Sequence, residues 1–390
     1  MVALIATSCD VRIYPLRARP TTGSDAAIGV DSAVPSDCPS QLVGFATMSD
    51  LGGEWDGGID ASPTLLLDGG VTGGGAPDPG TLVVVDAQDS DALTQLTTYA
   101  SDKTPGPLTI LVKGMISIPP TPDGGDTGGE QIRVSPNKTI LGADANSGLL
   151  GGGLGMTRVW NVIVRNMTIA RPNTEAAIDA IHIEKSHQIW IDHCDLSSTG
   201  GTGTYDGLVD ISDHSDFVTV SWTHYHDHKD SGLVGRSDTS AAAAEDAGTE
   251  HVTYDHDWFH NLATGPRIRV GTVHVLNNFF DQVTNYGVAS TDSANVLIEA
   301  DNFRSVAPVQ LDPDFGRVTT ILESATAGYV DLVNNMNYVG FPSGSDVITT
   351  TQSVPSTLFP YHYMPDSADS VPTLVTNCAG TGKIVVPSGN

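Results

Sequence analysis

Charged side chains are scarce in this sequence of 390 residues, and acids dominate them. Only 16% of the residues are Asp, Glu, Lys or Arg, and 18 Lys and Arg stand against 46 Asp and Glu, which gives a formal net charge of −28. Lysine occurs 6 times and glutamate 8 times, so aspartate supplies most of the charge. A field of this sign repels nucleic acid and anionic membrane surfaces. The composition therefore excludes nucleic acid as a partner.

Long apolar runs are missing as well. No apolar run reaches about 18 residues, so we expect no membrane-spanning helix. The sequence instead has 42 Gly and 23 Pro, a balance that argues against coiled coils and helical bundles. Many short strands joined by turns are the favoured interpretation.

Cysteine is rare, with four residues and no CxxC pair, which removes the usual zinc and redox signatures. Cys38 and Cys378 flank the expected folded unit, and either they form one disulfide or both are free thiols. Cys194 lies in an alternating apolar run and is expected to be a small buried residue. Residues 1–8 (MVALIATS) with Cys9 resemble the end of a lipoprotein signal. We therefore expect a secreted protein, with Cys9 as a candidate lipid anchor.

The chain divides into a lead-in and one large domain. Residues 1–40 lack periodicity and are predicted to be a signal remnant and disordered linker, and residues 41–390 the domain. Within it, 89–101 (DSDALTQLTTYAS) has the apolar spacing of a helix. Residues 341–390 carry no readable chemistry, and we expect a strand or two and a tail there.

Short alternating segments recur after residue 139. Aligning one apolar residue from each gives steps of 27, 29, 34, 21, 23 and 34 residues between Val162, Ile189, Val218, Val252, Val273, Val296 and Val330. One strand every 20–35 residues or so is typical of a β-solenoid, whereas a sandwich would place strands every 8–12 residues with hairpin turns. The sequence therefore predicts an all-β fold, a right-handed parallel β-helix with one short N-terminal helix.

Asparagines end several of these segments. Asn277, Asn278, Asn302, Asn334 and Asn335 are expected at bends, where amide side chains of successive coils hydrogen-bond in a ladder.

Carboxylates gather on two neighbouring coils. Asp206 and Asp210 in YDGLVD lie four residues apart and share a face of an extended strand, and Asp179 begins the preceding coil. Stacked coils lie about 4.8 Å apart, so the three acids would repel one another without a cation. Ca²⁺ prefers several carboxylate oxygens, which makes this a candidate calcium site. The alternative is that each aspartate caps a loop separately.

Two further clusters carry potential chemistry. In HYHDHKD (224–230), His224, His226 and His228 alternate like transition-metal ligands, although a polar bend is the simpler interpretation. In GPRIRVG (265–271), Arg267 and Arg269 lie two apart on one face. Paired guanidinium groups are suited to bidentate recognition of a carboxylated ligand, and a salt-bridged structural pair is the alternative.

Taken in order, these segments resemble the pectate lyase family, polysaccharide lyase family one, over roughly residues 40–340. The resemblance rests on KTILG, GGGL, NVIVRNMTI, DAIHIEKSHQIWIDHCDLS, YDGLVDISDHSDFVTVSWTHYHDH, LVGRSD, VTYDHDWFHN and PRIRVGTVHVLNNFF. It implies a right-handed parallel β-helix that cleaves α-1,4-polygalacturonate by calcium-dependent β-elimination. Asp179, Asp206 and Asp210 match the family's calcium ligands. Arg267 and Arg269 match the last two arginines of its RxPRxR motif, of which the last contacts substrate carboxylates.

Two positions depart from the family pattern. The first arginine of RxPRxR, the family's base, falls on Thr264, and its substrate-binding lysine falls on Asp230 beside Lys229. A threonine hydroxyl needs an activating neighbour to replace such a base. Arg267 and Lys229 are therefore the candidate catalytic residues, and with Arg269 they are the candidate substrate-binding residues. A different lyase mechanism, or a monomeric β-helix that binds acidic polysaccharide without cleaving it, are the alternatives.

Overall fold

The computed structural model describes residues 38–48, 70–74, 82–103, 106–119, 131–171, 179–198, 207–237, 239–304, 317–319, 328–336 and 354–386. All of them belong to one compact unit, Val34–Asn390. Met1–Ala33, with the candidate anchor Cys9, lies outside the described residues, and the predicted domain boundary near residue 40 stays a prediction.

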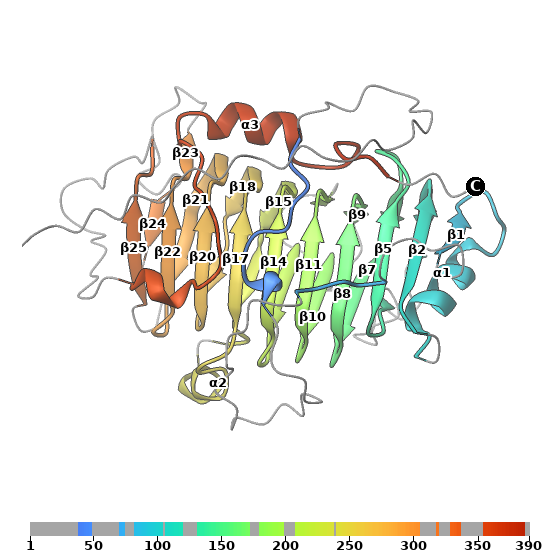
Figure 1. Ribbon diagram of the computed structural model, residues 1–390, viewed down its shortest axis with the longest axis horizontal. Coiled ribbons are helices and arrows are strands. Elements are labelled where there is room, and N and C mark those ends of the chain that lie inside the picture. The colour runs from blue at the N-terminus through green and yellow to red at the C-terminus, as the bar shows by residue number, and fades with distance from the viewer. Residues whose placement is uncertain are drawn as a thin grey trace, which may run out of the picture. The chain divides into compact units, whose positions relative to one another are not determined.

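Most of the described chain forms parallel strands that stack side by side, with β1 and α1 at one end of the stack and β25 at the other (Figure 1). Ten of them make the first sheet. Its strands are β1 (Leu82–Asp86), β2 (Leu108–Lys113), β5 (Lys138–Gly142), β8 (Trp160–Arg165), β11 (His187–Asp192), β14 (Asp216–Ser221), β17 (His251–Asp255), β20 (Thr272–Leu276), β22 (Asn295–Glu299) and β25 (Tyr329–Val333).

The remaining strands form two further faces. The second face contains β3 (Met115–Ser117), β6 (Gly148–Leu150), β9 (Thr168–Arg171), β12 (Asp195–Ser198), β15 (His224–Asp230), β18 (Trp258–Thr264) and β23 (Asn302–Arg304). The third face contains β4 (Gln131–Arg133), β7 (Gly153–Thr157), β10 (Ile181–Glu184), β13 (Val209–Ser212), β16 (Gly232–Val234), β19 (Arg267–Ile268) and β24 (Arg317–Thr319). The long strand β21 (Phe279–Ser290) pairs with both β18 and β19 and joins the two faces. Each complete coil thus visits the three faces in turn.

The predicted repeat is confirmed in register. Val162 of β8 pairs with Ile189, Ile189 with Val218, and the series continues without a slip through Val252, Val273, Val296 and Val330. All seven side chains are at most 3% exposed. Period-two alternation places them inside the coil, and burying one apolar residue per coil at the same place fixes the register. The fold is a right-handed parallel β-helix, as the sequence predicts.

A tight bend follows the first-sheet strand of each coil, and in the seven successive coils from β8 to β25 its first residue has positive φ. The seven residues at this place are Asn166, His193, Trp222, His256, Asn277, Ala300 and Asn334. Their spacing along the chain is the same 27, 29, 34, 21, 23 and 34 residues that separates the aligned strand residues, because each bend directly follows its strand.

The expected hydrogen-bond ladder is present one residue further on, but its composition is mixed. The backbone N–H of Thr223 donates to Asp257 Oδ1, that of Asp257 to Asn278 Oδ1, that of Asn278 to Asp301 Oδ1, and that of Asp301 to Asn335 Oδ1. Carboxylates therefore alternate with amides as acceptors. Burial raises the pKa of Asp257 and Asp301 well above the usual value, since neither reaches water.

Aromatic rings stack inside the second face. Tyr225, Phe259, Phe280 and Phe303 follow one another in consecutive coils, with ring centroids 4.7, 4.7 and 4.6 Å apart. These spacings equal the strand separation of a sheet, so the rings keep the coil repeat.

The helices partly match the expectation. The predicted helix is α1 (Ala92–Ser101), and the structure adds α2 (Ser240–Glu245), α3 (Val371–Cys378) and the short 3₁₀ turns η1 (Phe45–Thr47) and η2 (Ser356–Leu358). The expected strands near the C-terminus are not found in residues 354–386, so that expectation was wrong for the described part of this segment. No helix among the described residues has the length and apolarity to cross a membrane.

The C-terminal segment runs back along the bends. Asp366 exchanges hydrogen bonds with Asn277, Ala368 accepts one from Asn302, and Gly382 donates to Asn166 Oδ1. Two of the asparagines expected in the ladder, Asn277 and Asn302, thus bind this segment. A disulfide joins Cys38 to Cys378 at the end of α3, which decides between the two alternatives, and Cys194 is buried as predicted.

Candidate functional site

An outward-facing row of side chains crosses the third face. Strand pairing sets His182 of β10 opposite Asp210 of β13, Asp210 opposite Leu233 of β16, and Leu233 opposite Arg267 of β19. Their neighbours Ile181, Ile183, Ile211, Val234 and Ile268 are buried in the core. Alternation along these strands therefore points a histidine, a carboxylate and a guanidinium out of the same face.

Two of the three predicted calcium ligands, Asp179 and Asp210, lie beside His182 on this face. Asp179 precedes β10, and its Oδ2 lies 2.8 Å from Nδ1 of His182. His182 is in turn the register partner of Asp210 on the adjacent strand. Asp179 is 5% exposed and Asp210 is 7% exposed, so both carboxylates are largely withdrawn from water. The third predicted ligand, Asp206, lies outside the described residues.

Gly207 and Gly232 pack closely beside Asp210. A Cβ on Gly207 would collide with Asp210 Oδ1 and would come within 3.0 Å of the Gly232 Cα. The same Oδ1 accepts a hydrogen bond from the Leu233 backbone N–H at 3.1 Å. Close backbone approach thus fixes the orientation of this carboxylate, and the donor set of buried aspartate oxygens suits a hard cation such as Ca²⁺.

The paired arginines follow on the same face. Arg267 continues the row. Arg269 follows two residues later, just past the end of β19, and its Nη1 donates to the Gly235 carbonyl at 3.0 Å. Close to Arg269 lies Glu250, whose pKa is raised well above the usual value by burial and by neighbouring aspartates, while Arg269 opposes the shift. Both arginines therefore lie on the face that holds Asp210.

The two positions that depart from the family pattern contact each other. Asp230, Thr264 and Tyr286 are consecutive register partners, and the Thr264 hydroxyl donates to Asp230 Oδ1 at 2.9 Å. Burial raises the pKa of the Tyr286 phenol, and the Thr264 hydroxyl and Arg267 oppose that shift. A carboxylate and a hydroxyl therefore stand at the two positions that the family pattern gives to its lysine and its base, with the Tyr286 phenol beside them.

Lys229 is not part of this row. Its side chain is 51% exposed and its Nζ lies 3.3 Å from Asp230 Oδ2. It also lines a cavity of about 530 Å³ whose wall includes His226 and Asn261 of the second face. The lysine thus stands at the border between the two faces.

A larger cavity of about 900 Å³ lies on the third face beside His182. Its wall includes Lys103, Arg133 and Arg158, with Trp160 contributing an aromatic ring that is 39% exposed. Arg133 belongs to the same outward row, because it pairs with Gly155 and Gly155 pairs with His182. Three of the chain's 18 cations therefore gather next to the candidate calcium site.

His182 and this cationic cavity were missed by sequence reasoning. His182 had a signal, because it alternates with Ile181 and Ile183 directly after Asp179. The cations had none, since Lys103, Arg133 and Arg158 come from separate segments that only the coiling brings together.

Comparison with known proteins gives a consistent answer. A family model described as pectate lyase matches residues 66–384. Pectate lyase plyB of Emericella nidulans is 38% identical over 286 residues, which cover 71% of this chain and 77% of that protein. A probable pectate lyase B of Aspergillus oryzae is 40% identical over 239 residues, covering 60% of this chain and 66% of that protein.

Solved structures agree. A pectate lyase from Bacillus sp. N165, solved in complex with trigalacturonate, superposes with a TM-score of 0.66 at 26% identity, over 88% of this chain and 100% of that one. A doubly substituted pectate lyase from Xanthomonas campestris gives a TM-score of 0.61 at 26% identity, over 80% of this chain and 97% of that one. The chain belongs to the pectate lyase family.

Proposed function

We propose that this protein is a calcium-dependent polysaccharide lyase that cleaves unesterified α-1,4-polygalacturonate by β-elimination on its third face. The observation that carries the proposal is the outward row of His182, Asp210 and Arg267, with Asp179 bonded to His182. In a member of the pectate lyase family, this row brings carboxylates for a cation and guanidinium groups for a uronate onto one surface.

Asp179, Asp206 and Asp210 would hold the calcium ion. Bound there, the ion would supply positive charge that makes the C5 proton of the uronate more acidic. The proposal is supported by the burial of Asp179 and Asp210, since two buried carboxylates on adjacent coils are stabilised by a cation between them.

Arg267 and Arg269 would grip substrate carboxylates. Their fork of donors matches the geometry of a carboxylate, and the hydrogen bond from Arg269 to Gly235 restricts its rotation. β-Elimination also requires a group that takes the C5 proton while the glycosidic oxygen leaves C4. We assign that role first to Arg267, because it lies in the outward row, and second to Lys229, whose Nζ lies 3.3 Å from Asp230 Oδ2 at the border between the two faces.

The cavity beside His182 would bind further uronate units of the same chain. Lys103, Arg133 and Arg158 offset the field of a protein whose net charge is −28, and Trp160 offers an exposed ring against which a sugar can pack. An anionic polymer could thus approach an acidic protein along this strip.

The decisive experiment measures the ultraviolet absorbance of the unsaturated product with purified protein and polygalacturonate. We expect a rise with Ca²⁺, and no rise with excess chelator or with Asp210→Asn. Asp281→Asn, which changes a carboxylate on the second face, is the matched control and should keep the activity. Calcium-dependent binding to the polymer without any absorbance change would instead mean a binding protein that has lost cleavage.

Secretion and a monomeric state are part of the proposal. The Cys38–Cys378 disulfide supports secretion, because such bonds persist in oxidising compartments.

A further inference from the structure

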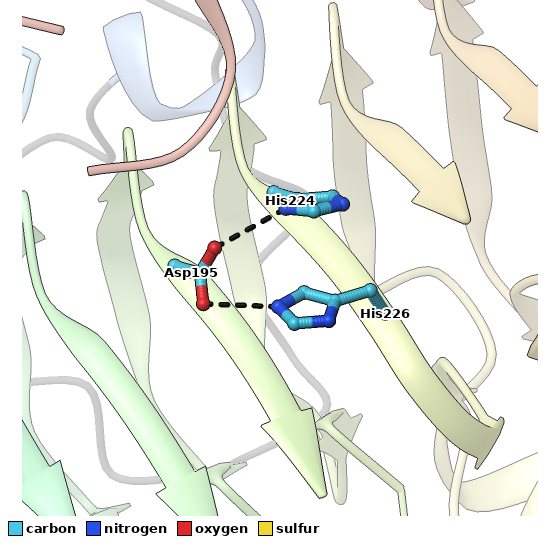
Figure 2. Close-up of side chains that lie close together, drawn as sticks. All are labelled: Asp195, His224 and His226. Carbon is cyan, nitrogen blue, oxygen red and sulfur yellow. Dashed lines mark hydrogen bonds and ion pairs between the residues drawn. The ribbon is translucent and has the colours of Figure 1, made fainter. Parts of the chain in front are cut away.

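A second cluster of ligand-type side chains lies on the second face, away from the outward row. Asp195 begins β12 and His224 begins β15, and the two are register partners on adjacent coils. His226 follows two residues later on the same side of β15. Asp195 Oδ2 lies 3.2 Å from His224 Nδ1, and Asp195 Oδ1 lies 3.0 Å from His226 Nε2 (Figure 2).

The spacing of these atoms suits a single ion. One ligand atom from each residue can be chosen so that all three lie within 4.8 Å of one another. Tetrahedral coordination with bonds of about 2.0–2.1 Å places ligand atoms roughly 3.3 Å apart, and each histidine nitrogen lies 3.0 or 3.2 Å from an oxygen of Asp195. Two imidazoles and one carboxylate favour Zn²⁺ and similar ions over Ca²⁺, which prefers oxygen alone.

Neighbouring groups hold the two imidazoles in place. His226 Nδ1 lies 2.8 Å from Asp227 Oδ2, and the other oxygen of Asp227 accepts a hydrogen bond from Asn261 at 2.6 Å. This carboxylate–histidine pair is the arrangement that orients metal-binding histidines and leaves the opposite nitrogen for the ion. The His224 ring stacks between His226 and Trp258, with centroids 4.2 Å from each.

The cluster is accessible and joins three segments. His226 and Asp227 line the 530 Å³ cavity of the second face, which gives an ion a route from solvent. The C-terminal segment passes directly over the cluster, because Gly380 donates to the Trp222 carbonyl at 2.8 Å and a Cβ on it would lie 3.5 Å from His224 Cβ. An ion here would connect two coils beneath this segment.

We propose that Asp195, His224 and His226 form a binding site for a divalent transition-metal ion, with Zn²⁺ as the best match, that staples neighbouring coils of the second face. The simpler interpretation drawn from the sequence, a polar bend, does not hold, because the three histidines lie in strand β15. His228, the third histidine of that motif, is not part of the site.

The test is calorimetric titration of metal-free protein with Zn²⁺ in saturating Ca²⁺, which keeps hard-cation sites filled. We expect one equivalent of Zn²⁺, lost in Asp195→Asn and His226→Gln and weakened about 10–100-fold in Asp227→Asn. His362→Gln removes an exposed histidine elsewhere and should change nothing. Co²⁺ should give visible absorption bands of a low-symmetry site in the wild type and in His362→Gln.

Thermal unfolding of each variant in its metal-free form checks that it folds. The Asp227→Asn variant keeps all three ligands, so its weaker binding would be a metal effect rather than misfolding. Unchanged stoichiometry and affinity in Asp195→Asn and His226→Gln would overturn the proposal, as would absence of Zn²⁺ binding by the wild type. None of these readouts depends on polygalacturonate cleavage, so the proposed function can fail without affecting this site.

Discussion

Thr264 stands where the resemblance to the pectate lyase family places an arginine. Its hydroxyl donates to Asp230, so the two substituted positions have become a hydrogen-bonded pair. A carboxylate at position 230 cannot donate to a substrate as a lysine would. Our proposal therefore assigns the role of the family's base to Arg267 or Lys229, the two candidates named from the sequence.

Replacing each of these two cations by alanine separates their roles. We expect Arg267→Ala to lower kcat by about 100-fold or more, because a positioned acid or base contributes roughly 10²–10⁴-fold. Lys229→Ala should change kcat less than about tenfold, since its side chain is half exposed and lines the second-face cavity. Initial rates of product absorbance at saturating polymer measure both. The reverse order would identify Lys229 as the base.

The bends are the elements that connect the coils to the C-terminal segment. His256 occupies one of them and lies 2.7 Å from Asp255 Oδ1 and 3.1 Å from Asp366 Oδ2. Burial lowers the pKa of this histidine, but the two carboxylates outweigh it and raise the pKa to about 9. The imidazolium thus ties the segment to the stack.

Alkaline pH should loosen this connection. Because the folded pKa of His256 is above the unfolded value of about 6.5, its stabilisation is complete below pH 6.5 and disappears as the pH rises through about 9. The shift corresponds to at most about 3 kcal/mol. We expect the thermal unfolding temperature of the wild type to exceed that of His256→Gln near pH 6. The two temperatures should converge as the pH rises to 10. A constant gap, or the same trend in His362→Gln, would contradict this assignment.

The strands could be predicted from the sequence, whereas the mixed hydrogen-bond ladder and helix α3 could not. Alternating burial in one strand per coil leaves a period-two trace, so Val162 through Val330 aligned correctly. The ladder was foreseen only for asparagine, because nothing local marks Asp257 or Asp301 as an acceptor for the preceding coil. Helix α3 has 8 residues, and its buried Val371 and Val375 belong to one apolar cluster with Phe279. Such long-range packing overrides weak propensity.

The candidate site was foreseen to a similar degree. Asp179 and Asp210 were predicted together because the coil repeat places them on adjacent coils, and the structure adds His182, which contacts Asp179 and is the register partner of Asp210. The proposed transition-metal site could be predicted only in part. His224 and His226 are close in sequence, whereas Asp195 lies 29 residues before His224, one coil away.

At the scale of the whole molecule, the proposed function makes charge decisive for the approach of substrate. A protein of net charge −28 and an anionic polymer repel each other at long range, while the cations of the 900 Å³ cavity would act at short range. Salt shortens the Debye length from about 8 Å near physiological strength to about 3 Å at 1 M. The long-range repulsion is therefore screened before the short contacts are.

Activity should accordingly rise with salt before it levels off. We expect kcat/KM on polygalacturonate to increase from low to moderate NaCl at fixed, saturating Ca²⁺. Arg133→Ala should lower it at every salt concentration, because the cationic cavity loses one contact. A steady decrease with NaCl would show that attraction, not repulsion, dominates the approach.

The Cys38–Cys378 bridge also decides how the molecule responds to pulling. The two cysteines are 340 residues apart in sequence but 5.3 Å apart between Cα atoms. Tension applied between the two ends of the chain would pass through this covalent link, and the coils enclosed by it would bear none of the load. Under stretching, the β-helix should therefore remain wound until the bridge is reduced.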